Sequence, residues 1–240
     1  MLKEKKFTLI EHLNELRYRL VVCITATSFF SLISYRYARV ILEILTKPVE
    51  KLVFISPLEL FMVYLKIAVI GGLILASPVV FYQLWKFVSS ALMLKEKRYV
   101  RMFLPASLLL FIGGCVFAFI FVVPYGTKFL LSFATEKIVP MISVSKYVSF
   151  AAVLIFASGL AFELPVVVVF LTRIGLVNPV ALRRQWKYIV VLIFVIAAVI
   201  TPTPDVFTQC MLAVPMLVLY VISIWIATLI YKRRSLDANL

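Results

Sequence analysis

The sequence is poor in charged residues and in histidine, and apolar side chains dominate it. Of its 240 residues, 15% are charged and 64% are hydrophobic, and only one is histidine. Soluble globular domains carry about 25% charged residues, so this composition excludes that class. The sequence is typical of an integral membrane protein whose chain crosses the bilayer several times.

Catalytic patterns are also missing. The single histidine, His12, lies in the N-terminal segment, and there is no HExxH or GxSxG pattern. A Ser/His hydrolase or an HExxH zinc protease needs a histidine at its site, so neither class fits. Cys23, Cys115 and Cys210 fall within or at the edge of apolar runs, where a thiol behaves as a small hydrophobic group. We expect no enzymatic activity, metal, cofactor or disulfide.

Six apolar runs predict the fold. Most of them approach the ~20 residues that cross ~30 Å of hydrocarbon. They cover residues 20–41, 66–88, 103–125, 148–171, 188–201 and 207–231. We therefore expect an all-α polytopic protein, with one domain over residues 1–240, six transmembrane helices and both termini on one side.

The fifth run is shorter than the others. It holds about 14 residues, or ~21 Å of helix at 1.5 Å per residue. The turn that follows, TPTPDVF, leaves room only for a direct return into the sixth helix. We expect a short spanning helix rather than a re-entrant one, with a thinned bilayer beside it.

The distribution of basic residues predicts the orientation. Of 25 Lys and Arg residues, 17 lie in the N-terminal segment, the second-to-third and fourth-to-fifth connections, and the C-terminal segment. The positive-inside rule places these segments, and both termini, in the cytoplasm. This orientation explains most of the net charge of +14, and no basic stretch resembles a nucleic-acid module. Anionic lipids are the expected partners of this face.

Glycine and proline predict how the helices pack. Gly71–Gly72 and Gly113–Gly114 lie within spans, where they permit close helix approach or bending. Pro78, Pro165 and Pro215 interrupt helices and cause kinks. We expect a bundle with a concave face that suits docking of another membrane segment.

Two segments on the external side are too short to be domains. One holds about 25 residues after the first span, and the other about 22 residues around 137–146. We expect both to cap the bundle, with short amphipathic helices such as residues 37–45.

Glu163 is the most unusual residue because it lies in the middle of the fourth apolar run. A charge at that depth costs about 2.5 to 3.5 kcal/mol on insertion scales, so a functional role is the default hypothesis. The alternative is a protonated carboxyl that hydrogen-bonds a neighbouring helix and has a purely structural role.

Glu15 and Glu96 are acids within otherwise basic cytoplasmic segments. Each has a simple structural interpretation. Glu15 is spaced to pair with Arg19 one turn away, and Glu96 can be a solvated charge among basic neighbours.

Seven motifs occur in one order along the chain. They are EHLNELRYRL at 11–20, Lys47-Pro48, PLELFMVYLK at 57–66, SPVVFYQLWKF at 77–87, KEKR at 95–98, FELP at 162–165 and TPTPDVFTQ at 201–209. In this order and at this spacing, they resemble the TatC family, the polytopic core of the twin-arginine protein translocase. Residues 87–93 depart from the family pattern, which usually has an Ala-Pro and a Leu-Tyr pair there.

The resemblance implies a receptor for signal peptides with consecutive arginines, which exports folded proteins across the cytoplasmic (inner) membrane of a prokaryote. It implies single-span TatA/TatB-type partner subunits and an oligomeric working complex. By position, it implies a signal-peptide site at Glu15, Arg17, Phe87 and Glu96, a partner-docking groove at Glu163, and external functional residues at Pro48 and Asp205.

The chemistry agrees with this assignment, because guanidinium groups are best held by carboxylates that accept paired hydrogen bonds. The alternative function is a proton-coupled secondary transporter that uses Glu163. Against it, the sequence shows no inverted repeat and no second ionisable group at matching depth.

Overall fold

The structure of the protein is a computed structural model, which describes residues 9–49, 52–54, 56–90, 97–135, 141–201 and 205–237. Helices make up nearly all of this part of the chain. They are α1 (Leu9–Arg36), α2 (Ala38–Thr46), α3 (Pro57–Ser90), α4 (Lys97–Phe117), the π-helical turn η1 (Ala118–Val122), α5 (Val123–Leu131), α6 (Val144–Ala161), α7 (Leu164–Arg173), α8 (Pro179–Arg184), α9 (Trp186–Ile200) and α10 (Val206–Asp237).

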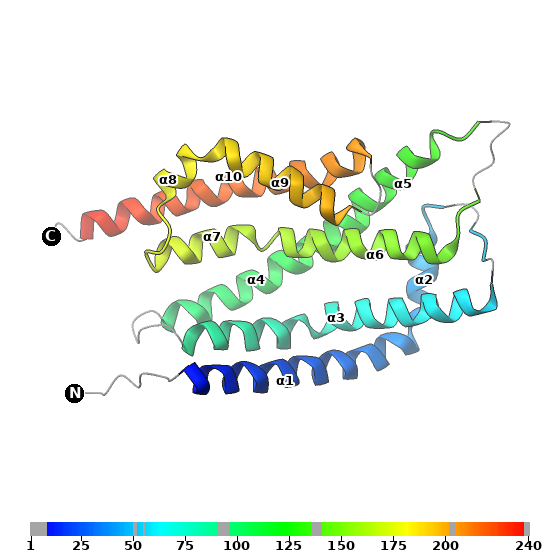
Figure 1. Cartoon of the computed structure of the whole chain (residues 1–240), viewed down its shortest axis with the longest axis horizontal. Coiled ribbons are helices and arrows are strands. Elements are labelled where there is room, and N and C mark those ends of the chain that lie inside the picture. The colour runs from blue at the N-terminus through cyan, green and yellow to red at the C-terminus, as the bar shows by residue number, and fades with distance from the viewer. Residues whose placement is uncertain are drawn as a thin grey trace.

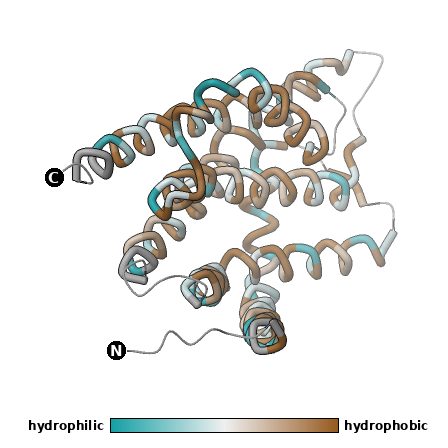
Figure 2. Tube along the Cα trace, turned by 60° about the vertical axis from the view of Figure 1, so that its left-hand side comes forward, coloured by the Kyte–Doolittle hydropathy of each residue, from teal (hydrophilic) through white to brown (hydrophobic). Residues whose placement is uncertain are grey.

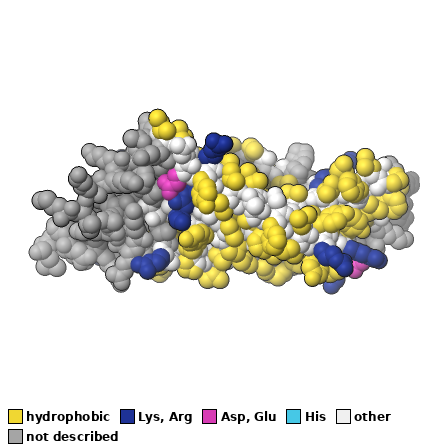
Figure 3. All heavy atoms as spheres, turned by 90° about the horizontal axis from the view of Figure 1, so that it is seen from below, with side chains coloured by type: hydrophobic (Ala, Val, Ile, Leu, Met, Phe, Trp, Pro, Cys, Tyr) yellow, Lys and Arg dark blue, Asp and Glu magenta, His cyan; other side chains and the backbone are white. Residues whose placement is uncertain are grey.

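Five stretches are long and apolar enough to cross a membrane: Leu13–Arg36, Pro57–Ser89, Arg101–Leu131, Val144–Arg173 and Val206–Lys232. The apolar helix α9, Trp186–Ile200, is shorter. Helix α1 begins and α10 ends at the same end of the bundle (Figure 1). Hydrophobic residues predominate along the helices (Figure 2), and one face shows a hydrophobic band with basic side chains near either end (Figure 3). The predicted all-α membrane fold with a short fifth apolar helix is confirmed.

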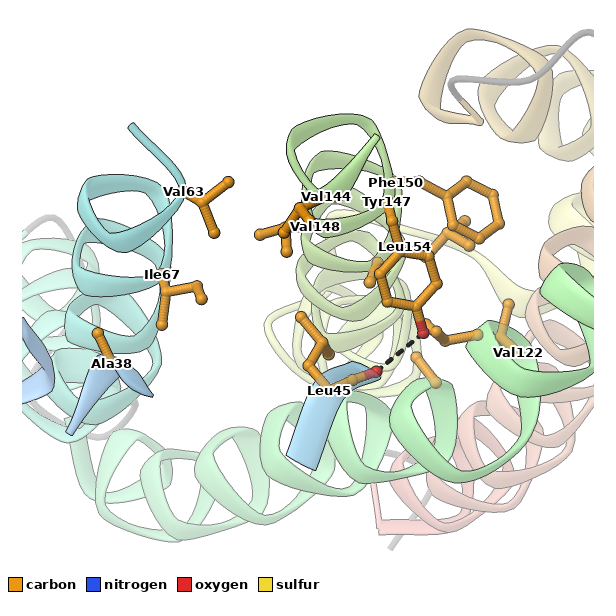
Figure 4. Close-up of a cluster of buried hydrophobic side chains, with 13 residues drawn as sticks. Ala38, Leu45, Val63, Ile67, Val122, Val144, Tyr147, Val148, Phe150 and Leu154 are labelled. Atoms are coloured by element: carbon orange, nitrogen blue, oxygen red, sulfur yellow. Dashed lines mark hydrogen bonds between the residues drawn. The ribbon is translucent and has the colours of Figure 1, made fainter. Parts of the chain in front are cut away.

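The predicted end of the first apolar helix, residue 41, is wrong. Helix α1 ends at Arg36, and the chain turns at Tyr37, whose φ of −104° and ψ of 6° are not helical. The next residues form α2, a separate amphipathic helix that buries Ala38 and Leu45. The Tyr147 hydroxyl donates a hydrogen bond of 2.8 Å to the Leu45 carbonyl (Figure 4). The apolar residues after Arg36 therefore pack against the bundle as part of the predicted amphipathic helix, which forms a cap.

The third and fourth apolar stretches also differ from the predicted ones. The third apolar stretch continues six residues past the predicted end at 125, because α4 passes through η1 into α5 without leaving the helical path. The fourth is broken between α6 and α7, where Phe162 and Glu163 form a turn just before Pro165. Proline cannot donate the helical hydrogen bond, which explains the break at this point.

The two segments that were predicted to be external join through backbone pairing. Val53 donates to the Ile142 carbonyl at 3.0 Å, and Val144 donates back to the Val53 carbonyl at 3.1 Å. Below this bridge, α3 and α6 are held by Glu59, whose Oε1 accepts from the Ser143 hydroxyl and, at 3.1 Å, from the Ser145 amide.

Glycine permits two close helix contacts. A Cβ at Gly72 would lie 2.6 Å from backbone atoms of Ser31, so α1 and α3 touch there. A Cβ at Gly114 would lie 2.6 Å from the Ser158 carbonyl oxygen, so α4 and α6 touch near the break at Glu163. Gly113, by contrast, has no such neighbour within 4 Å, so the close contact of this glycine pair is made by Gly114.

Candidate functional site

Glu163 lies at the break between α6 and α7. Its amide donates to the Leu160 carbonyl at 3.1 Å, and its carbonyl accepts from the Val167 amide at 3.0 Å, so the backbone is satisfied through the turn. The side chain is half-buried, and its Oε1 atom is buried without a hydrogen-bond partner among the described residues. A buried carboxyl oxygen without a partner is costly, so this position has capacity for one more donor.

Two residues from neighbouring helices support this carboxyl. The Ser107 hydroxyl of α4 faces Glu163 and is fully buried. Its oxygen accepts a hydrogen bond of 3.0 Å from the Trp85 indole of α3. Because a hydroxyl has a single hydrogen, this contact leaves the Ser107 hydrogen available to the carboxyl. Helices α4 and α3 thus place Ser107 and Trp85 behind Glu163, and the sequence patterns gave neither residue a role of its own.

The second candidate region lies where α1 begins and α3 ends. Arg19 is buried, with 8% of its surface exposed, and its guanidinium forms an ion pair with Glu15 one turn earlier. Its other terminal nitrogen, Nη1, donates to Gln83 Oε1 of α3 at 3.3 Å. The intrahelical pair raised as the alternative for Glu15 is therefore present. It is also part of an interhelical contact, which the spacing alone did not reveal.

The remaining residues of the predicted signal site are distributed as follows. Phe87 is half-buried one turn beyond Gln83 on α3. Helices α1 and α3 run antiparallel (Figure 1). Because Gln83 contacts Arg19, Phe87 is level with Glu15, which lies one turn before Arg19. Arg17 is exposed and, being two positions from Glu15, faces another direction. Glu96 lies outside the described residues.

Pro48 and Asp205 both lie beside helix ends. Pro48 is exposed in the turn that follows α2. Asp205 caps α10, because its Oδ2 atom accepts from the Thr208 amide at 2.7 Å. One turn into the helix, the Gln209 side chain donates to the Phe194 carbonyl of α9 at 3.0 Å. Asp205 therefore has a clear structural role in starting α10 beside α9.

The sequence patterns gave Lys66 no role of its own, because this residue counted only as the first of a span and the last of the motif at 57–66. Lys66 lies within α3, and its ammonium donates to the Ser145 and Ser149 hydroxyls of α6 at 2.8 and 2.9 Å. A lysine among apolar residues of one helix is a signal that the sequence does show. Its two serine partners could not be predicted, because they lie about 80 residues away in the chain. In the described part of the chain, no three His, Cys, Asp or Glu residues are grouped to hold a metal ion.

Comparison with known proteins assigns the family. Residues 11–215 match the family model of the Sec-independent protein translocase protein (TatC). The chain is 42% identical to the TatC protein of Carboxydothermus hydrogenoformans over 97% of this chain and 98% of that one, and 41% identical to that of Aquifex aeolicus over 95% and 97%. It is similar to a crystal structure of the twin-arginine translocase receptor TatC, with a TM-score of 0.82 and 41% identity over 92% of this chain and 99% of the other. The chain, with its broken fourth apolar helix and short fifth, belongs to the TatC family.

Proposed function

We propose that this chain is the signal-peptide receptor and core subunit of a twin-arginine translocase, which exports folded proteins. The observation that carries the proposal is the match to the solved receptor, at 41% identity over 92% of this chain. The family assignment gives no support to the alternative of a proton-coupled transporter.

The proposed signal site combines Glu15, Arg17, Phe87 and Glu96. Helix α1 contributes Glu15, which pairs with Arg19 of the same helix. The hydrogen bond from Arg19 to Gln83 of α3 holds α1 against α3. A signal-peptide arginine that binds Glu15 has to share the carboxylate with Arg19. Glu96 would hold the second arginine, since two guanidinium groups call for two carboxylates. Phe87, level with Glu15, would contact the apolar part of the signal peptide.

The proposed partner site is Glu163. A single-span subunit of the TatA/TatB type would place a polar group of its helix against the buried Oε1 atom, which has no partner among the described residues. Pro48 and Asp205 would act on the external side, and both chain termini would be cytoplasmic, as the 17 of 25 basic residues indicate. The working complex would be oligomeric.

The experiment that tests the function uses two peptides of one sequence. Purified protein should retain a signal peptide with paired arginines and lose it when both are replaced by lysines, because an ammonium cannot reproduce the guanidinium fork. Equal retention of the two peptides would contradict the proposal.

A further inference from the structure

A cavity of about 460 Å³ opens between α8, the start of α9 and α10. It is lined by Arg183, Trp186, Tyr220, Val221, Trp225 and Thr228 among others. Figure 1 shows these helices meeting at the end of the bundle where α1 begins. The residues that line the cavity are distant in sequence from those of the proposed signal site.

The depth of this cavity matches the boundary between hydrocarbon and headgroups. Tyr220 and Thr228 lie 14 and 22 residues after the start of α10 at Val206. At 1.5 Å per residue these distances are about 21 and 33 Å, and the hydrocarbon is ~30 Å thick. The cavity therefore extends from the apolar part of one leaflet to its surface. Trp186 and Trp225 are 56% and 66% exposed, as expected for tryptophans at a membrane interface.

The guanidinium of Arg183 gives the cavity a positive charge. Arg183 forms no ion pair among the described residues. The sequence has no Asp or Glu from 164 to 204 or from 206 to 236, so neither α8, α9 nor the cavity-lining part of α10 can neutralise it. Arg184 and Lys187 add positive charge nearby.

Helix α8, which forms part of the cavity wall, is held in place by hydrogen bonds. Asn178 caps α8 by accepting from the Val180 amide at 2.9 Å. The Tyr220 hydroxyl donates to the Leu182 carbonyl at 3.1 Å, which holds α8 against α10. Arg183 follows Leu182 directly, so this contact sets its position at the cavity.

We propose that this cavity binds one glycerophospholipid with an anionic headgroup. Arg183 holds the phosphate by paired hydrogen bonds. An acyl chain lies along Val221 between the rings of Trp186 and Trp225. A guanidinium without an ion pair among the described residues lies beside an apolar wall, and these two features match the two ends of such a lipid. The proposal does not depend on signal-peptide binding.

Tryptophan fluorescence gives a direct test. The chain has three tryptophans, and two of them line this cavity, whereas Trp85 is buried between α3 and α4. The full-length protein in detergent is titrated with phosphatidylglycerol whose acyl chains carry bromine, which quenches nearby indoles. We expect saturable quenching at one lipid per protein, lost in the Trp225→Phe and Trp186→Phe double variant. Dibrominated phosphatidylcholine should quench only at higher concentration.

The matched pair Arg183→Gln and Arg184→Gln isolates the site. Both variants lose one charge from α8, but only Arg183 lines the cavity. We expect Arg183→Gln to need about tenfold more brominated phosphatidylglycerol and Arg184→Gln to titrate like the original protein. Helical content by circular dichroism controls for folding.

Three results would overturn the proposal. Equal weakening in both arginine variants would mean general surface attraction. Displacement of the lipid by inorganic phosphate at millimolar concentration would mean that the headgroup alone binds. The protein concentration can also be raised while the detergent concentration and the lipid-to-protein ratio stay fixed. If the quenching is then lost, a second copy of the chain occupies the cavity.

Discussion

The Arg19 guanidinium joins α1 to α3, because it pairs with Glu15 of its own helix and donates to the Gln83 side chain across the interface. Exposed pairs at this spacing contribute only about 0.2 to 0.5 kcal/mol. Here the two side chains are 10% and 22% exposed, so removal of one partner leaves a buried charge without its counterion.

Arg19→Gln should therefore lower the free energy of unfolding by about 1 to 3 kcal/mol. Arg17→Gln is the matched control, since Arg17 is exposed on the same helix, and its effect on stability should be within about 0.5 kcal/mol. Thermal unfolding in detergent measures both. Equal melting temperatures for the two variants would show that the buried contact contributes nothing.

The proposed signal site makes a separate prediction. Glu15→Gln and Glu96→Ala should each weaken binding of the paired-arginine peptide about tenfold, because a charge-assisted contact contributes about 1.5 to 3 kcal/mol. Glutamine at 15 keeps a hydrogen-bond acceptor for Arg19 but removes its counterion, so helical content by circular dichroism has to be measured beside peptide affinity. Glu43→Gln is the control, since Glu43 pairs with Arg39 in α2. Unchanged peptide affinity in a folded Glu15→Gln, Glu96→Ala double variant would leave the apolar part of the signal as the determinant.

Hydropathy predicted the fold well because a helix in lipid satisfies its own backbone, so long apolar runs leave few alternatives. It failed at residues 37–41, where the apolar residues belong to α2, which packs in the cap. Apolar character reports burial, and it does not distinguish lipid from the protein interior.

The site was predictable only where its contacts are local. The spacing of Glu15 and Arg19 suggested their pair, whereas Gln83 is 64 residues from Arg19 and no pattern connects them. Ser107 was equally hidden, because a serine in an apolar run carries no signal until its partners are known. Gly113 and Gly114 are neighbours of the same type, and only the helix packing separates their roles.

These two glycines give a sharp comparison. A Cβ at 114 would meet the Ser158 carbonyl oxygen at 2.6 Å and the Gly159 Cα at 2.9 Å, both backbone atoms, so α4 has to move away from α6. Gly114→Ala should cost about 1 to 3 kcal/mol of stability. Gly113→Ala meets nothing within 4 Å and should be neutral or slightly stabilising, because alanine favours helix. If both alanines melt alike in detergent, the close contact is not important for stability.

The orientation predicted from basic residues is tested by single cysteines in a cysteine-free background. Ser132 and Gln185 are exposed and lie beyond opposite ends of apolar helices, so both thiols are reachable from solvent. An impermeant thiol reagent added outside intact cells should label Ser132→Cys and spare Gln185→Cys until the membrane is opened. The reverse labelling would invert the topology.

Glu163 separates three hypotheses. If its carboxyl docks a polar group of a partner helix, Glu163→Ala should leave stability and signal binding nearly unchanged, since removing an acid from an apolar run relieves a cost. The same variant should impair export and crosslinking to the partner. Glu163→Gln should be milder, because an amide keeps hydrogen-bonding capacity.

The alternatives predict other patterns for the same two variants. If the carboxyl is purely structural and is held by Ser107, both Glu163→Ala and Glu163→Gln should lower the melting temperature. Ser107→Ala should lower it by a similar amount, and the Glu163→Ala, Ser107→Ala double variant should show no further loss. A proton carrier requires that glutamine be as damaging as alanine, because an amide does not ionise near neutral pH and so cannot bind and release a proton. Measuring stability, peptide affinity and export for each variant distinguishes these outcomes, and normal export with alanine at position 163 would end the docking hypothesis.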